Sequence, residues 1–309
     1  MQNADEIALH TLTTGRKRVA KTPYILIFPA IVLIAGIMIY PLGTVFYLAF
    51  QNYNPTMPFA NGFCGLDNFK KIFTTNEFYE ALLVSAKWVV AEVVLQLVLG
   101  MIVALLLNQK FRGRGFFRAI IFAPWAMSGV LTAVLFSLIF NQNFGVLNDI
   151  LKKAGWISQN IAWLANTKVV LNSVIIAELW KGIPFFAISL LAAMQGFPQD
   201  IYEAARVDGC SRVKVFRHIT LPLLKETIIL TTLLRTIWEF NSVDLIYALT
   251  GGGPVGKTTT LSLLIANQAL RTNNYGYGSA ISVISFFLLA VVAVIYIGAT
   301  GFGRESDLQ

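Results

Sequence analysis

Six long apolar stretches, separated by short polar segments, dominate the chain. Each is long enough to cross the hydrocarbon core of a bilayer, which takes roughly 20 apolar residues in a helix. The pattern therefore predicts an all-α integral membrane protein with six transmembrane helices, over about Tyr24–Phe50, Ala81–Leu107, Ala119–Phe140, Val169–Met194, Thr227–Leu249 and Gly278–Ala299. The first stretch is too long for a signal peptide and lacks a small-residue cleavage site, so we expect the mature chain to keep it.

Composition agrees with a membrane-embedded chain. Hydrophobic residues make up 56% of the 309 residues and charged residues only 13%, whereas soluble domains carry about 25% charged residues. The net charge of +8 would suggest a nucleic-acid partner in a soluble protein. Here Lys and Arg in loops beside a membrane account for it, so we expect no nucleic acid to bind.

The distribution of Lys and Arg predicts the orientation. The polar segments on one side of the membrane carry roughly twice as many as those on the other, and cytoplasmic loops hold this excess. The richer side contains Arg16–Lys21, Lys110–Arg118, Arg206–Lys225 and Arg304. We therefore expect a cytoplasmic N-terminal tail over 1–22, a transmembrane domain over 23–300 and a cytoplasmic C-terminal tail over 301–309.

The stretch LTGGGPVGKTTTLSL contains the letters of a phosphate-binding loop. Gly251, Gly256, Lys257 and Thr258 satisfy G-x-x-x-x-G-K-[ST]. Such a loop needs a buried strand before it and a cytoplasm around it, but this one follows a predicted membrane helix on the outer side. We interpret the match from Gly251 to Thr258 as coincidental, with its glycines ending a helix and turning the chain. The alternative is a self-contained ATP-using membrane enzyme, which also lacks an acidic partner for Mg²⁺.

The predicted fifth span is rich in polar side chains, namely Arg235, Glu239, Asn241, Ser242 and Asp244, with Trp238 among them. A charge at the centre of a span costs at least ~2.5–3.5 kcal/mol on insertion scales. Arg235 and Glu239 lie one helical turn apart and could neutralise each other. Because so many polar groups exceed what packing needs, we expect Trp238, Glu239, Asn241 and Asp244 to line a path for a polar solute. The alternative is that they make internal packing contacts.

The predicted fourth span holds Glu178 and Lys181 on one face, followed by Gly182 and Pro184. The simplest interpretation is an internal ion pair beside a proline kink. A gate hinge at the kink is an alternative. A proton or ion relay through Glu178, Lys181 and Asp244, as in a secondary transporter, is another. Neither cysteine has metal-ligand spacing, and we expect no metal or cofactor on this chain.

The longest predicted cytoplasmic segment runs from Gln195 to Lys225. Its pattern predicts a short helix, a turn at Asp208-Gly209 and a second short helix, typical of an interfacial element or a docking site. Its sequence resembles the EAA loop of permease subunits in binding-protein-dependent ABC importers. The matching residues are Glu203-Ala204-Ala205, Asp208-Gly209, Phe216, Ile219 and Leu221-Pro222, while Cys210 stands where the family usually has Ala.

Further motifs resemble the sugar-importer branch of that family. They include FPAIVLIAGIMIYPL, RGRGFFRAIIFAPW and the T-x-GGP pattern of Thr250, Gly252, Gly253 and Pro254. The resemblance covers about residues 23–300 and is strongest to the first permease subunit of maltose or glycerol-phosphate transporters. It implies a type I ABC importer permease with six transmembrane helices and a cytoplasmic helix-turn-helix coupling loop at about 196–222.

The resemblance also implies a role for particular residues. Glu203 to Gly209 would dock in a cleft of an ATPase subunit, where Ala204, Ala205 and Gly209 permit close approach, Glu203 accepts charged hydrogen bonds and Asp208 braces the turn. Phe240, Asn241 and Asp244 would contact a sugar, although the acidic Asp244 departs from the usual neutral amide. The loop with Thr250, Gly252, Gly253 and Pro254 would lie near the outer gate.

The implied partners are a second permease subunit, two ATPase subunits that hold ATP and Mg²⁺, and an extracytoplasmic solute-binding protein. The implied location is a bacterial or archaeal cytoplasmic membrane, and the implied solute is a sugar, most suitably an oligosaccharide. Glycerol phosphate or another polar solute is the alternative. A phosphate would need a cation in the pathway, for which Arg235 is the only candidate in the fifth span.

Overall fold

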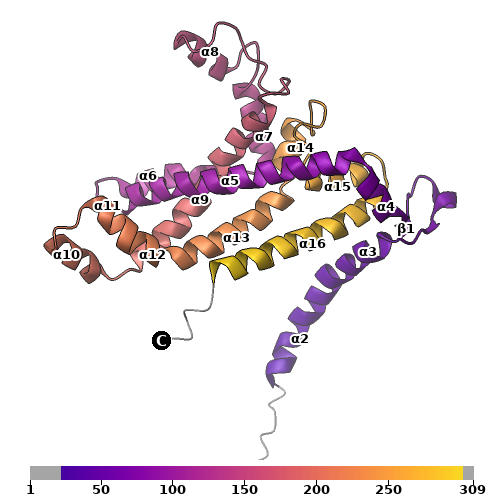
Figure 1. Ribbon diagram of the computed structural model, residues 1–309, viewed down its shortest axis with the longest axis horizontal. Helices are drawn as coiled ribbons and strands as arrows, with labels where there is room; N and C mark the ends of the chain where they lie inside the picture. The colour runs from indigo at the N-terminus through magenta and orange to yellow at the C-terminus, as the bar shows by residue number, and fades with distance from the viewer. Residues whose placement is uncertain (1–21, 302–309) are drawn as a thin grey trace, which may run out of the picture. The chain divides into compact units, whose positions relative to one another are not determined.

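The computed structural model describes residues 22–301 and is mostly helical (Figure 1). The predicted tails, over 1–22 and 301–309, lie almost entirely outside the described residues. The chain divides after Tyr47 into two compact units. The first unit holds α2 (Thr22–Ile34), a π-helical turn (Ala35–Ile39) and most of α3 (Tyr40–Leu48), and Ile25–Ala49 is long and apolar enough to span a membrane.

The second unit is built around two long helices, α5 (Asn76–Asn108) and α9 (Val170–Gln195), which pack along each other. Gly100 permits their close approach, because a Cβ on it would lie 2.5 Å from Cβ of Phe186. α13 (Lys225–Asn241) packs against both helices, and α16 (Tyr275–Thr300) packs against α13 and α15 (Leu261–Leu270). The core is therefore the seam where α5, α9 and α13 meet.

Shorter elements connect these helices. Before α5 come β1 (Gln51–Asn52), which pairs antiparallel with β2 (Gly62–Phe63), and α4 (Asp67–Thr74). Between α5 and α9 come α6 (Arg114–Phe122), α7 (Gly129–Ile139) and α8 (Val146–Lys153), and Figure 1 shows α7 and α8 leading away from the α5–α9 pair. After α9 come α10 (Gln199–Val207), α11 (Arg212–Val215), a π-helical turn (Phe216–Thr220) and α12 (Leu221–Leu223), and after α13 comes α14 (Asp244–Leu249).

Within residues 22–301, four helices are long and apolar enough to cross a membrane, and they match the predicted first, second, fourth and sixth spans. The predicted third span is not straight, because α6 and α7 are bent by 100° at a break. The predicted fifth span is not one helix either, because α13 ends at Asn241 and α14 begins at Asp244. A chain with four or five spanning segments of this kind is a multi-pass membrane protein, whereas a count of six stays a prediction.

Candidate functional site

A cluster of buried polar side chains lies where α5, α9 and α13 meet, and we call it the buried ionic cluster. It consists of Glu92 and Gln96 from α5, Glu178 and Lys181 from α9, and Arg235 and Glu239 from α13. The Arg235 guanidinium lies 2.6 Å from Oε1 of Glu239 and 3.2 Å from Oε1 of Glu178. Both predicted ion pairs are confirmed, and the structure links them through Arg235 into one network.

The α5 residues complete this network. Nε2 of Gln96 donates to Oε2 of Glu92 at 2.8 Å and to Oε1 of Glu239 at 3.0 Å. Gly182 leaves room for the network, because a Cβ there would collide with both Arg235 and Gln96. Trp88 adds a further bond from α5, since its indole Nε1 donates to the backbone oxygen of Glu239 at 3.2 Å. The three helices are therefore held by directed polar contacts as well as by apolar packing.

The sequence reasoning missed the part that α5 plays in this cluster. Glu92 and Gln96 are four residues apart and both are buried, so they face the same direction on α5. That spacing was the available signal, but Glu239, the partner of Gln96 across helices, lies on a helix far along the chain. Buried polar groups in a membrane are costly unless they are paired. The pairing across helices compensates part of this cost, because one carboxylate oxygen each of Glu92, Glu178 and Glu239 is buried without a hydrogen-bond partner among residues 22–301.

The residues predicted to line a solute path are divided among different environments. Glu239 belongs to the buried ionic cluster, and Trp238 is half-exposed with its ring 5.1 Å from that of Phe185. Asp244 lies beyond the break in the helix, and its Oδ2 accepts a hydrogen bond from the backbone N of Gly129 at 3.0 Å. Asp244 and Asn241 therefore do not lie on one continuous helix, because α13 ends at Asn241 and α14 begins at Asp244.

Phe240 and Asn241 do line a common cavity, of about 610 Å³, which we call the α13–α16 cavity. Its walls come from α13, α15 and α16, and no charged side chain among the described residues lines it. Its lining is mostly apolar, with aliphatic side chains and the rings of Phe240 and Phe286, and the hydroxyl groups of Ser262, Ser282 and Ser285 lie among them. Ser262 donates to the backbone oxygen of Phe240, which ties α15 to the end of α13. A ring face and several hydroxyl or amide groups suit a polar, uncharged ligand.

The glycine-rich loop between α14 and α15 is folded on itself. The buried Thr258 hydroxyl contacts Oγ1 of Thr250 at 2.8 Å and donates to the backbone oxygen of Gly253 at 3.0 Å. Gly252 has a φ of +93°, and a Cβ on it would lie 2.5 Å from Oγ1 of Thr259. Because the Thr258 hydroxyl is already engaged, it is not placed to meet Mg²⁺ as in a nucleotide-binding loop. Lys257 itself is exposed.

The segment predicted as a helix-turn-helix contains the short helices α10 and α11, while its cytoplasmic side and its coupling role stay predictions. Gly209 separates the two helices with a φ of +69°, a left-handed conformation that suits glycine, and the Cys210 backbone N bonds to the Ala205 oxygen across the turn at 2.9 Å. Of the predicted coupling residues, Glu203, Ala204, Asp208 and Gly209 are exposed, and Ala205 is buried. The exposed set therefore forms a surface that a partner could reach.

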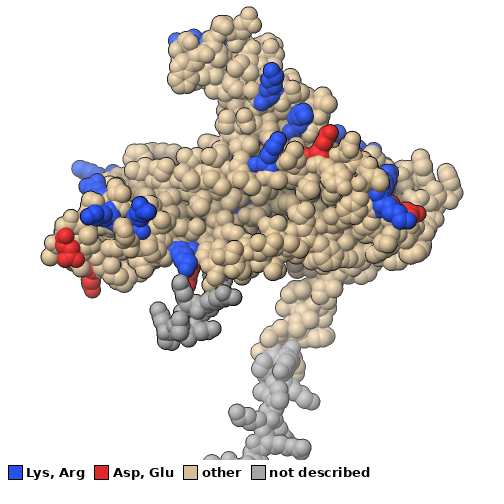
Figure 2. Space-filling model, in the orientation of Figure 1, with Lys and Arg blue, Asp and Glu red and all other residues tan. Residues whose placement is uncertain are grey.

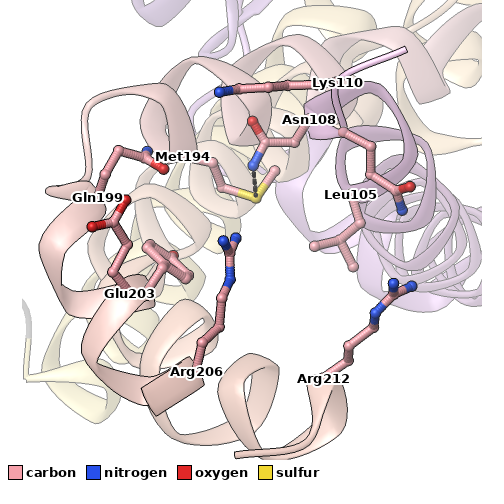
Figure 3. Close-up of a pocket in the computed structure, with 10 residues that line it drawn as sticks. Leu105, Asn108, Lys110, Met194, Gln199, Glu203, Arg206 and Arg212 are labelled. Carbon is pink, nitrogen blue, oxygen red and sulfur yellow. Dashed lines mark hydrogen bonds between the residues drawn. The ribbon is translucent and has the colours of Figure 1, made fainter.

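A second cavity, of about 570 Å³, lies between this segment and the ends of the long helices, and we call it the basic cavity (Figure 3). Leu105, Asn108, Gln109 and Lys110 line it from the end of α5, Met194 from the end of α9, and Gln199, Tyr202, Glu203, Arg206 and Arg212 from α10 and α11. Figure 2 shows Lys and Arg side chains together with Asp and Glu side chains at this end of the molecule, while most of the surface along α13 and α16 carries no charge.

Comparison with known proteins places these features in a family. The model of the binding-protein-dependent transport system inner membrane component matches residues 96–302. The chain is 37% identical to the trehalose/maltose transport system permease protein of Thermococcus litoralis, over 96% of this chain and 99% of that one. It is 32% identical to the diacetylchitobiose uptake system permease protein of Streptomyces coelicolor, over 94% and 89%.

The fold is similar to that of solved transporters. A chain of a bacterial ABC transporter involved in the import of the acidic polysaccharide alginate matches with a TM-score of 0.78 at 22% identity, covering 90% of this chain and 94% of that one. A chain of the alginate transporter in complex with a pentasaccharide-bound periplasmic protein matches with the same TM-score at 21% identity, covering 89% and 92%.

Proposed function

Because the chain belongs to the family of binding-protein-dependent transport system inner membrane components, and is thus a transport subunit rather than an enzyme, we propose that it forms half of the pathway of an ATP-driven sugar importer. Among sugars, we propose an oligosaccharide as the solute that is transported. Relatives named for trehalose or maltose and for diacetylchitobiose support this class. In this proposal the six-span domain covers 23–300, and both termini are cytoplasmic.

The α13–α16 cavity is the observation that carries the choice of a sugar. Phe240 offers an aromatic ring and Asn241 an amide, and the serine hydroxyls can bond to sugar hydroxyls. A glycerol phosphate would need a cation there, but the Arg235 guanidinium is engaged by Glu178 and Glu239 in the buried ionic cluster. Trp238, Glu239 and Asp244 do not line the cavity, so we assign them to supporting the helices around it.

In this proposal, α10 couples the conformational changes of the ATPase subunits to this chain. We propose that Glu203, Ala204, Ala205, Asp208 and Gly209 dock on an ATPase subunit and that two such subunits hold ATP and Mg²⁺. The exposed Glu203 can accept charged hydrogen bonds, and the turn at Gly209 fixes the angle between α10 and α11. The coupling loop over about 196–222 would then transmit closure of the ATPase pair to α9 and α13, which flank it in the chain.

An ATP-driven importer of this kind also needs a second permease subunit and a binding protein. A second permease subunit would complete the pathway, and an extracytoplasmic binding protein would deliver the sugar to the outer face of a bacterial or archaeal cytoplasmic membrane. We place Thr250, Gly252, Gly253 and Pro254 near the outer gate. The compact hydrogen bonding of that loop supports a rigid surface there.

Substitution of Asn241 tests the proposed sugar site. Asn241→Ala should raise the sugar concentration that gives half-maximal uptake in the reconstituted transporter by roughly tenfold, the effect of one lost hydrogen bond of about 1.5 kcal/mol. Asn172→Ala, which removes an exposed amide of α9 that does not line the cavity, is the matched control. Equal effects of the two substitutions would count against the α13–α16 cavity as the sugar site.

A further inference from the structure

The basic cavity holds more positive than negative charge. Three cations line it, Lys110, Arg206 and Arg212, and Glu203 is the one carboxylate among the residues that line it. Within residues 22–301, no ion pair engages any of the three cations. Figure 3 shows the Arg206 side chain reaching toward Met194, with Arg212 on one side and Glu203 on the other. An anion that enters the cavity would therefore meet an excess of positive charge.

Uncharged polar groups line the same cavity as the cations, and one of them, the Tyr202 hydroxyl, also contacts Oγ1 of Thr220 at 3.3 Å. Asn108, Gln109 and Gln199 bring amide groups, and Tyr202 brings a hydroxyl. Guanidinium groups present pairs of N–H donors that match the oxygens of a phosphate, and amide and hydroxyl donors can bond to the remaining oxygens. The cavity therefore has the charge and the donors that a phosphate group needs.

The position of the basic cavity favours a phosphate from the membrane. Asn108 is the last residue of α5, and Met194 is the last but one of α9, so the cavity lies at the ends of two spanning helices. Lipid headgroups lie at that depth. Leu105 and Met194 add apolar surface on the side of the long helices, which suits the first carbons of a lipid.

We propose that the basic cavity binds a phosphate-bearing anion, with Arg206, Arg212 and Lys110 as its charged partners and an anionic phospholipid headgroup as its source. Bound there, the headgroup joins the ends of α5 and α9 to α10 and α11, so that the coupling segment is held to the spanning helices through a lipid. This site is separate from the proposed sugar cavity and does not depend on which solute is carried.

Lipid binding to the purified transporter complex tests the proposal. Native mass spectrometry should detect phosphatidylglycerol retained at low lipid concentration, and phosphatidylcholine, which has no net charge, should not replace it. The Arg206→Gln/Arg212→Gln variant should bind phosphatidylglycerol about 30-fold more weakly, since each Lys or Arg near a membrane surface contributes about fivefold. Lys214→Gln/Arg217→Gln removes the same charge from exposed residues outside the cavity and should change binding less than about twofold.

Other results of these experiments would overturn the proposal or its assignment of the anion to a lipid. Equal weakening by the two double variants, or equal retention of the two lipids, would overturn it, because surface charge alone would then explain binding. Inorganic phosphate that displaces phosphatidylglycerol at millimolar concentration would overturn the lipid source and leave a free-phosphate site. If the double variant does not assemble, Lys110→Gln, which lies outside the segment proposed to dock on the ATPase, should weaken binding about fivefold.

Discussion

Removing the guanidinium of Arg235 should destabilise the helix bundle strongly. Arg235→Met preserves much of the side-chain volume but leaves the carboxylates of Glu178 and Glu239 without their shared cation, which lies 3.2 Å and 2.6 Å away. Breaking a buried ion pair by removing one partner costs about 3–5 kcal/mol. Glu178 keeps Lys181 at 3.5 Å and Glu239 keeps the Gln96 amide at 3.0 Å, so we expect the lower end, about 3 kcal/mol.

The assay is equilibrium unfolding of the purified chain in mixed micelles, which gives the free energy of unfolding. Arg235→Met/Glu239→Leu removes a charge of each sign, and it should recover most of the loss, because apolar replacement of a whole pair is often neutral. Lys87→Met, which removes an exposed cation of α5, is the control and should change stability by less than about 0.5 kcal/mol. A loss below about 1 kcal/mol for Arg235→Met, or a double variant no more stable than the single, would refute the reasoning.

Four further substitutions test other parts of the structure. Glu92→Gln should change the free energy of unfolding by less than about 1 kcal/mol, because the buried ionic cluster has more carboxyl groups than cations, and a larger loss in the same assay would contradict this. Gly209→Val should strain the left-handed turn by about 1–2 kcal/mol and slow ATP-driven uptake, whereas Gly209→Asn, which tolerates that conformation, should slow it less. Asp244→Ala should cost about 1 kcal/mol in thermal unfolding through the lost bond to Gly129, and Asp244→Asn should retain most of that stability. Lys257→Ala should leave uptake and ATPase activity of the complex unchanged, and a clear fall in ATP crosslinking to this chain would revive a nucleotide site.

The sequence predicted the long helices well, because each depends only on a continuous apolar run. It predicted the Arg235–Glu239 and Glu178–Lys181 pairs for a similar reason, since each pair lies within one turn of a single helix. Helical spacing alone fixes such contacts, whatever the rest of the chain does.

Contacts between distant helices were beyond the same reasoning. The bonds of Gln96 to Glu239 and of Arg235 to Glu178 depend on how α5, α9 and α13 pack. The break after Asn241 was also missed, because the residues that follow it still have a helical pattern. That break turns Asp244 toward the start of α7, which changes its interpretation from a solute contact to a support for a helix end.

The glycine-rich loop shows how topology decides between interpretations of one motif. Its letters from Gly251 to Thr258 fit a phosphate-binding loop, but the loop follows the short helix α14 rather than a strand. Its threonines bond within the loop. The family resemblance through Thr250, Gly252, Gly253 and Pro254 uses the same residues with a different structural meaning, that of a compact turn at a helix end.

Uptake into proteoliposomes tests the central claim most directly. The chain, its partner permease and the ATPase subunits would be reconstituted together with the binding protein outside, using radiolabelled maltose and trehalose as probes. We predict sugar accumulation that requires ATP on the ATPase side and stops when the ATPase is omitted. Accumulation that continues without the ATPase, driven by an ion gradient, would contradict an ATP-driven importer and favour a secondary transporter.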